Sequence, residues 1–100
     1  MLIELKDSDN DKTIKASKDD IVSITLVWKP SSGFLWQASD TTAGVLQSVK
    51  HEGDNPTPGG NAYVTFKFQI LKTGILEFNL ARPWAEHEPP VRWFTVNINV

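Results

Sequence analysis

Residues 62–70 read Ala-Tyr-Val-Thr-Phe-Lys-Phe-Gln-Ile, and this stretch decides the fold. Apolar side chains occupy every second position of the stretch. Alternation with a period of two predicts a β-strand that buries one face and exposes the other. The residues expected to point inward are Ala62, Val64, Phe66, Phe68 and Ile70.

The same alternation continues in both directions along the chain. Further strands are predicted at 1–6, 14–16, 21–28, 34–38, 44–50, 75–80 and 92–100. No window shows the sustained period of a helix. Short strands separated by turns about every ten residues are typical of an all-β sandwich or barrel. Seven to eight strands in this length favour an immunoglobulin-like antiparallel β-sandwich.

Individual positions carry more detailed expectations. The apolar residues of the last strand, from Phe94 to Val100, are expected inside. The turn at 72–74 places Gly74 where a positive φ is expected. Trp28 and Trp36, on strands either side of the first long loop, are expected to pack in the core.

Length and composition indicate one globular domain over residues 1–100. Hydrophobic residues make up 40% of the chain and the net charge is −2. Both signs of charge are spread along the sequence, so neither a nucleic-acid footprint nor a basic membrane patch is expected. The chain has no cysteine, which excludes a disulfide, a reactive thiol and a zinc–thiolate site. We expect a monomer when the protein is free.

The N-terminus lacks the basic start and long apolar run of a signal peptide. This absence favours a cytoplasmic location. If a leader has been removed, a secretory or lysosomal location is expected instead.

The order of the strands predicts where their connections lie. Successive antiparallel strands run in opposite directions, so their connections alternate between the two ends of a sandwich. The long connections at 29–33, 51–60 and 82–91 then share one end, and the short ones at 39–42 and 72–74 share the other. Long loops stiffened by proline on a rigid scaffold are typical of binding sites. The alternative is that loop lengths have simply drifted, since surface loops tolerate insertion.

Catalytic chemistry has little support in the sequence. Ser31, His87 and Asp54 could be drawn as a hydrolytic triad, but triads are recognised by geometry and the spacing gives none. Glu86-His87-Glu88 contains metal-ligand types, although adjacent residues point in different directions. We therefore expect no enzyme activity and no cofactor.

A calcium loop is suggested by Asp7, Asp9 and Asp11 but is incomplete. Lys12 stands where such a loop needs glycine, and Lys18 stands where it needs glutamate. This segment is expected to be a solvated turn, and no metal site is expected.

Two tryptophans fall outside the predicted core. Trp93 is out of phase with the inward residues of the last strand. Trp84 follows Arg82-Pro83 within a loop, and an aromatic residue and an arginine beside a proline are typical of a binding hot spot. Trp84 could equally fold back and close the end of the sandwich.

Three motifs in the predicted loops suggest a known family. The first is Lys29-Pro30-Ser31-Ser32-Gly33-Phe34 with Trp36 two places on, the second is Thr57-Pro58-Gly59-Gly60, and the third is Arg82-Pro83-Trp84. Their order and spacing resemble those of the chagasin-type inhibitors of cysteine peptidases. The corresponding family motifs are Asn-Pro-Thr-Thr-Gly-aromatic-x-Trp, Gly-x-Gly-Gly and Arg-Pro-Trp. The resemblance covers essentially the whole chain.

The resemblance implies a reversible, tight-binding inhibitor of papain-like, cathepsin L-like cysteine peptidases. In that family three loops form a wedge that fills the active-site cleft. The implied peptidase-binding residues are Lys29, Pro30, Ser31, Ser32, Gly33, Phe34, Pro58, Gly59, Gly60, Arg82, Pro83 and Trp84. The first loop would cover the catalytic thiol, and the loops at 51–60 and 82–91 would contact either side of it.

The motifs depart from the family pattern at four positions. Lys29 replaces asparagine, Ser31 and Ser32 replace threonines, and Thr57 replaces the first glycine of the second motif. These changes bear on which peptidase is preferred. The alternative function is an immunoglobulin-like adhesion or carbohydrate-binding module that uses exposed Trp84 and Trp93.

Overall fold

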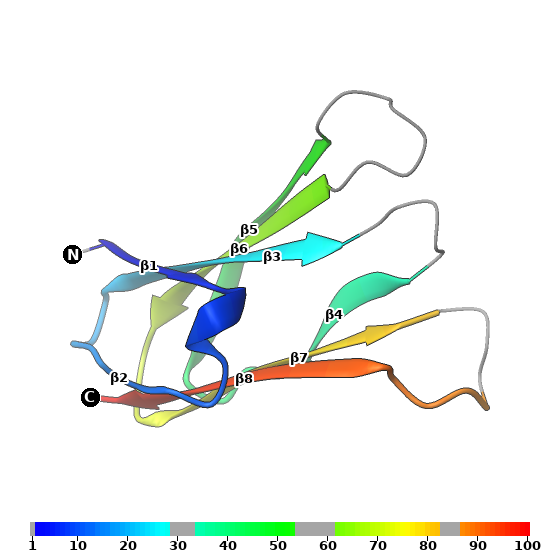
Figure 1. The fold of residues 1–100 in the computed structure, drawn as a ribbon. Helices are drawn as coiled ribbons and strands as arrows, with labels where there is room; N and C mark the ends of the chain where they lie inside the picture. The colour runs from blue at the N-terminus through cyan, green and yellow to red at the C-terminus, as the bar shows by residue number, and fades with distance from the viewer. Residues whose placement is uncertain (1, 29–33, 54–61, 83–86) are drawn as a thin grey trace.

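The structure is a computed structural model that describes residues 2–28, 34–53, 62–82 and 87–100 (Figure 1). Within these residues the chain forms eight strands and one short 3-10 helix. In chain order they are β1 (Leu2–Lys6), η1 (Asp7–Asp9), β2 (Thr13–Lys15), β3 (Ile21–Trp28), β4 (Leu35–Asp40), β5 (Gly44–Gly53), β6 (Ala62–Ile70), β7 (Gly74–Ala81) and β8 (Arg92–Asn99). No helix in the described part of the chain is long and apolar enough to cross a membrane.

The strands form two four-stranded sheets packed face to face. One sheet has the order β1-β3-β6-β5 and the other has the order β2-β8-β7-β4. The predicted all-β sandwich of seven to eight strands is therefore confirmed. The chain passes between the sheets at η1, where β1 of the first sheet is followed by β2 of the second (Figure 1).

Two strand pairs differ from the expected antiparallel arrangement. β1 pairs with β3 in parallel, and β2 pairs with β8 in parallel. Strands that follow one another directly in a hairpin must be antiparallel, but β1 and β3 are separated by η1 and β2. Residues 2–15 first run beside β3 in its direction, cross to the other sheet at η1 and then run beside β8 in its direction. Both N-terminal strands are therefore parallel to their neighbours.

The core lies between the sheets and follows the predicted alternation. All five inward residues of β6 are buried, and Phe66 and Phe68 extend from it to the second sheet. There the ring of Phe78, which is fully buried, lies 4.7 Å from the ring of Phe66, 5.8 Å from that of Phe68 and 6.2 Å from that of Phe94. Phe78 thus joins β6 of the first sheet to β8 of the second.

Several local expectations are wrong. Val100 is 51% exposed, because β8 ends at Asn99 and the core ends with Ile98. Gly74 does not have a positive φ; a Cβ there would lie 2.7 Å from the Thr42 hydroxyl and 2.9 Å from the Ala43 nitrogen. Glycine is required at this position by the close approach of the neighbouring turn. Trp36 lies in the core as expected, and Trp28 is half-buried but packs against the core.

Candidate functional site

Six strand ends meet at one end of the sandwich. Trp28 of β3 and Gly53 of β5 both pair with Ala62 at the start of β6. In the other sheet, Leu35 at the start of β4 pairs with Ala81 of β7, whose neighbour Leu80 pairs with Arg92 of β8. The long connections predicted to share an end are thus attached to strand ends that do share one (Figure 1). The second connection was predicted to start at residue 51, but His51, Glu52 and Gly53 pair with β6 and belong to β5.

The opposite end of the sandwich is closed by two short turns. Leu71 and Lys72 both donate backbone N–H groups to the carbonyl of Ala43, at 2.9 and 3.2 Å. Ala43 is fully buried. The turns between β4 and β5 and between β6 and β7 therefore pack on one another, which confirms the predicted asymmetry between the ends.

The three pairs of strand ends have a fixed order across the molecule. β5 and β6 belong to the first sheet, β7 and β8 belong to the second, and β3 and β4 belong to different sheets. In Figure 1 the ends of β3 and β4 lie between the other two pairs. The end of β3, at Trp28, and the start of β4, at Leu35, therefore lie in different sheets at the centre of this end.

A hydrogen bond between the sheets joins the two strands that flank the central connection, β3 and β4. The indole Nε1–H of Trp36, at the start of β4, donates to the carbonyl oxygen of Val27, at the end of β3, over 3.0 Å. The Trp36 side chain is almost completely buried. A bond in such surroundings is shielded from water, so it holds the end of β3 close to the start of β4.

A second contact joins the central connection to the one between β7 and β8. The Arg82 guanidinium lies over the ring of Phe34, with Cζ 4.4 Å from the ring centroid. Its Nη1 also lies 3.5 Å from Oε1 of Glu88, and both of these charged side chains are more than one-third exposed. A cation this close to a ring face is attracted by the ring quadrupole. Arg82 thus has two partners within the protein, the ring of Phe34 and the carboxylate of Glu88.

A longer contact of the same type lies nearby. The Arg92 guanidinium is 5.9 Å from the ring centroid of Trp36, so this contact reaches from β8 across β7 to β4. Trp28 packs edge-on against His51 of β5, with ring centroids 5.5 Å apart. Aromatic and basic side chains therefore line the strand ends of both sheets.

Of the predicted binding residues, the structure describes two and brings them into contact. Phe34 is half-buried against the core, and Arg82 stacks on it. The other ten lie outside the described residues: Lys29, Pro30, Ser31, Ser32, Gly33, Pro58, Gly59, Gly60, Pro83 and Trp84. Trp93 is described and is 50% exposed, in line with its phase in the sequence.

The candidate catalytic and metal groups do not form a site in the described part of the chain. Ser31, Asp54 and Glu86 lie outside it, and no group of three or more potential metal ligands occurs within it. Asp9, the central carboxylate of the calcium-like segment, accepts hydrogen bonds from the Lys12 Nζ and the Lys6 backbone N–H, each 2.9 Å long. These two bonds lower the pKa of Asp9 below its ordinary value.

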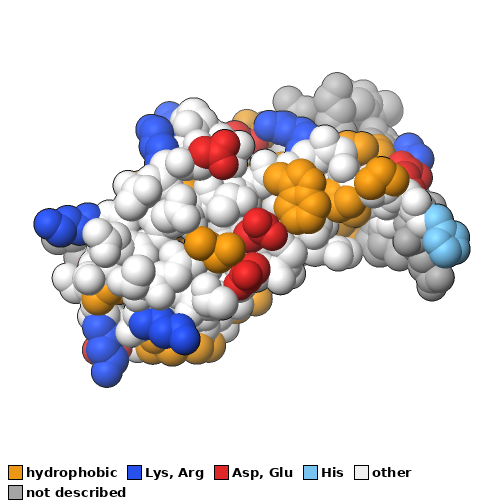
Figure 2. All heavy atoms as spheres, turned by 90° about the horizontal axis from the view of Figure 1, so that it is seen from below, with side chains coloured by type: hydrophobic (Ala, Val, Ile, Leu, Met, Phe, Trp, Pro, Cys, Tyr) orange, Lys and Arg blue, Asp and Glu red, His pale blue; other side chains and the backbone are white. Residues whose placement is uncertain are grey.

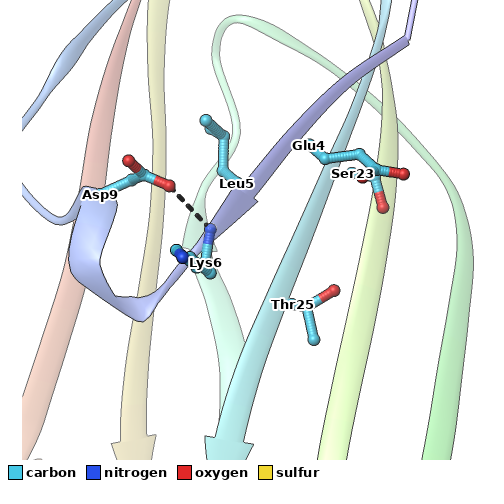
Figure 3. Close-up of a pocket in the computed structure, with 6 residues that line it drawn as sticks. All are labelled: Glu4, Leu5, Lys6, Asp9, Ser23 and Thr25. Atoms are coloured by element: carbon cyan, nitrogen blue, oxygen red, sulfur yellow. Dashed lines mark hydrogen bonds between the residues drawn. The ribbon is translucent and has the colours of Figure 1, made fainter.

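A hollow of about 410 Å³ lies beside Asp9 on the outer face of the first sheet (Figure 3). It is lined by Glu4, Leu5, Lys6, Asp9, Ser23 and Thr25. The close-up shows Asp9 turned toward the Lys6 nitrogen that it binds, away from Thr25. The hollow thus offers mixed polar groups but no paired acid and base.

Sequence reasoning missed the internal partners of the site. Glu88 lies six residues after Arg82, and opposite charges across one loop could have suggested their pairing. The bond from Trp36 to the carbonyl of Val27 has no such signal, because every residue has a carbonyl. These contacts define the class of protein: a β-sandwich whose three long connections all start from one end, where contacts within and between the sheets join the strand ends.

Comparisons with known proteins agree with that class. Residues 15–98 match the family described as chagasin family peptidase inhibitor I42. The chain is 26% identical over 103 residues to Amoebiasin-1 of Entamoeba histolytica, covering 98% of this chain and 99% of that protein. It has the fold of the cysteine protease inhibitor EhICP2 of Entamoeba histolytica, with a TM-score of 0.84, 22% identity and coverage of 99% and 95% of the two chains.

Two more solved structures share the architecture. The solution structure of Amebosin superposes with a TM-score of 0.75 at 25% identity, covering 98% of this chain and 96% of that one. The structure of PbICP-C in complex with falcipain-2 superposes with a TM-score of 0.68 at 14% identity, covering 98% of each chain.

The chain belongs to the chagasin family of peptidase inhibitors, since the family match spans most of its length. It is therefore a protein inhibitor and not an enzyme. The adhesion or carbohydrate-binding alternative is not favoured by this membership.

Proposed function

We propose that this protein is a reversible, tight-binding inhibitor of papain-like cysteine peptidases, including cathepsin L-like enzymes. It inserts three loops into the active-site cleft as a wedge: those at 29–34 and 82–91, and the part of the predicted 51–60 loop that follows β5. The observation that carries the proposal is the gathering of all six strand ends that bear these loops at one end of the sandwich. The chain acts as one domain and is a monomer when free.

The binding residues are those of the three motifs. They are Lys29, Pro30, Ser31, Ser32, Gly33 and Phe34 in the first loop, Pro58, Gly59 and Gly60 in the second, and Arg82, Pro83 and Trp84 in the third. The central position of the β3 and β4 ends supports placing the first loop over the catalytic thiol (Figure 1). The other two loops then contact opposite walls of the cleft.

Two described contacts explain how such a wedge could bind without being cleaved. The bond from Trp36 to Val27 fixes the arms of the first loop, and Arg82 holds Phe34 at its end. A loop held in this way cannot easily move a peptide bond into line with an attacking thiolate. Binding also orders less of the chain, so more of the contact energy remains as affinity.

Arg82 has two roles, one within the inhibitor and one toward the peptidase. Its guanidinium packs on Phe34 inside the inhibitor, and its exposed side still has donors available to the peptidase. The relatives support the target class. EhICP2 is a cysteine protease inhibitor, and PbICP-C has been seen in complex with falcipain-2.

Alkylation of the peptidase thiol tests the position of the first loop. Papain would be treated with iodoacetamide alone and with a saturating amount of the inhibitor. We expect much slower alkylation of the thiol in the complex, and the ordinary rate once the complex has dissociated on dilution. An equal rate of alkylation with and without saturating inhibitor would contradict the placement of the loop over the thiol.

A further inference from the structure

The outer face of the second sheet exposes apolar side chains beside the loop-bearing end. Trp36, Leu80 and Phe94 point into the core, so their neighbours in sequence point outward. The outward residues include Leu35, which is 39% exposed, and Trp93, which is 50% exposed. We call the four residues Leu35, Ala81, Val91 and Trp93 the apolar side patch.

The patch is continuous across three strands. Leu35 of β4 pairs with Ala81 of β7. Val91 donates its backbone N–H to the carbonyl of Leu80 over 2.9 Å, which places it directly beside Ala81. Val91 is 53% exposed and directly precedes β8, and Trp93 lies two residues further along, in β8. The four residues are therefore close neighbours, and polar Asn79, which pairs with Trp93, borders them on β7.

Figure 2 views the molecule from the side of this sheet. Hydrophobic side chains gather there toward the end that carries the pale blue histidine, and acidic side chains lie beside them. One carboxylate of this face belongs to Glu77. It accepts hydrogen bonds from Ser39 over 3.0 Å and from Thr95 over 3.4 Å, so a fixed charge borders the patch on the side away from the loops.

The patch is continuous in sequence with two of the three loops. Leu35 directly follows Phe34, and Ala81 directly precedes Arg82. Val91 is the last residue of the 82–91 loop. A partner that holds the first and third loops is therefore brought against this side of the sandwich.

We propose that the apolar side patch is a second contact surface for the same peptidase, with Trp93 as its anchor. The inference rests on the proposed function. In the complex, the apolar side patch packs against an apolar area of the peptidase, beside the active-site cleft and next to the wall that receives the third loop. Three of its four residues lie on strands and Val91 directly precedes β8, so contact with the patch orders little additional chain.

The outer face of the first sheet provides a contrast. Between β3 and β6 it carries Thr25 and Thr65, whose hydroxyl groups lie 3.0 Å apart, and Lys67. Tyr63 is exposed on this face to a similar degree, at 42%, but its surroundings are polar. Tyr63 is thus a matched aromatic control on the face that is not expected to touch the peptidase.

The test compares Trp93→Ala with Tyr63→Ala in the inhibition of papain. We expect Trp93→Ala to raise the inhibition constant about tenfold, mainly through faster dissociation, as for an anchoring aromatic residue. Tyr63→Ala should leave the constant within about twofold of the unchanged protein, as for a residue outside the interface. Val91→Asp is a second variant, which should weaken inhibition by placing a charge in the apolar contact.

The outcomes separate this inference from the proposed function. If the unchanged protein does not inhibit papain-like enzymes, the proposed function itself fails. If it inhibits and the folded Trp93→Ala and Val91→Asp variants inhibit equally well, the proposed contact through the apolar side patch is overturned, while the proposed function of the loops stands. If sedimentation shows that Trp93→Ala turns a dimer into a monomer without changing inhibition, the patch joins two copies of the inhibitor, which also overturns the inference.

Discussion

Arg82 and Phe34 form a cation–π pair that links the first and third binding motifs inside the inhibitor. The guanidinium carbon lies 4.4 Å from the ring centroid, and the guanidinium also pairs with Glu88, with Nη1 3.5 Å from Oε1. Both motifs were expected to face the peptidase. The pair shows that Phe34 and Arg82, one residue from each motif, contact each other within the protein.

The pair predicts that Arg82 and Phe34 are energetically coupled. A double-mutant cycle with Arg82→Ala and Phe34→Ala should give a coupling of about 0.5–1 kcal/mol in inhibition of papain, the range for a partly exposed cation–π pair. Each single change should weaken inhibition, and the double change should weaken it less than the sum. Strict additivity would show that the two residues contact the peptidase independently.

The indole of Trp36 should matter for both stability and inhibition. Trp36→Phe keeps most of the buried ring but removes the donor to the Val27 carbonyl, which should cost about 1–2 kcal/mol of unfolding free energy. Inhibition should weaken as well, because the arms of the first loop are no longer fixed. Chemical denaturation and inhibition constants would measure the two effects.

Trp28→Phe provides the matched control for that change. The indole nitrogen of Trp28 is buried without a hydrogen-bond partner in the described part of the chain. Removing this nitrogen should therefore destabilise the protein less than the change at Trp36. Equal losses for the two variants would contradict the importance of the bond from Trp36 to Val27.

Gly74 is predicted to reject any side chain. Gly74→Ala places a Cβ about 2.7 Å from the Thr42 hydroxyl and 2.9 Å from the Ala43 nitrogen, so the two turns must separate. Overpacking of this kind costs roughly 1–3 kcal/mol in unfolding free energy. Lys72→Ala, an exposed change in the same turn, should be nearly neutral in thermal or chemical denaturation. A fully stable Gly74→Ala variant would show that the turns can move apart freely.

Asp9 should contribute to acid sensitivity in a defined direction. Its pKa in the folded protein lies below the ordinary value of 3.8, because Lys12 and the Lys6 N–H stabilise the carboxylate. The stabilisation is therefore fully present above the unfolded pKa and is lost as the pH falls through the lower folded pKa. Asp9→Asn should be less stable than the unchanged protein at pH 6, and the difference should shrink below about pH 4.

A second variant separates this effect from net charge. Asp11→Asn makes the same change in net charge two residues away. Denaturation of both variants between pH 6 and pH 2.5 would compare them. A stability difference at Asp9 that is the same at every pH would show that the hydrogen bonds, and not the ionisation, account for it.

The sequence predicts the core well because burial follows alternation. The inward residues of β6 and β7 were assigned from their period alone, and all of them are buried. The common end of the long connections followed from strand direction, which is set by hairpin geometry. Both features depend on patterns that extend over many residues, so single exceptions do not hide them.

Features that depend on one neighbour were not predictable. The parallel pairing of β1 and β2 is decided by which strand they meet in space, and three to five residues carry too little pattern to show it. Gly74 looked like a residue with a positive φ, although its neighbour Ala43 is what excludes a side chain. The partner of Arg82 could not be read from the motif, because the motif records residue types and not contacts.

The most direct test of the central claim is a titration of active papain with the inhibitor, followed by hydrolysis of a small substrate. We expect a linear loss of activity that ends at one inhibitor per active site and is recovered on dilution as the complex dissociates. Full papain activity in the presence of a large excess of folded inhibitor would contradict it.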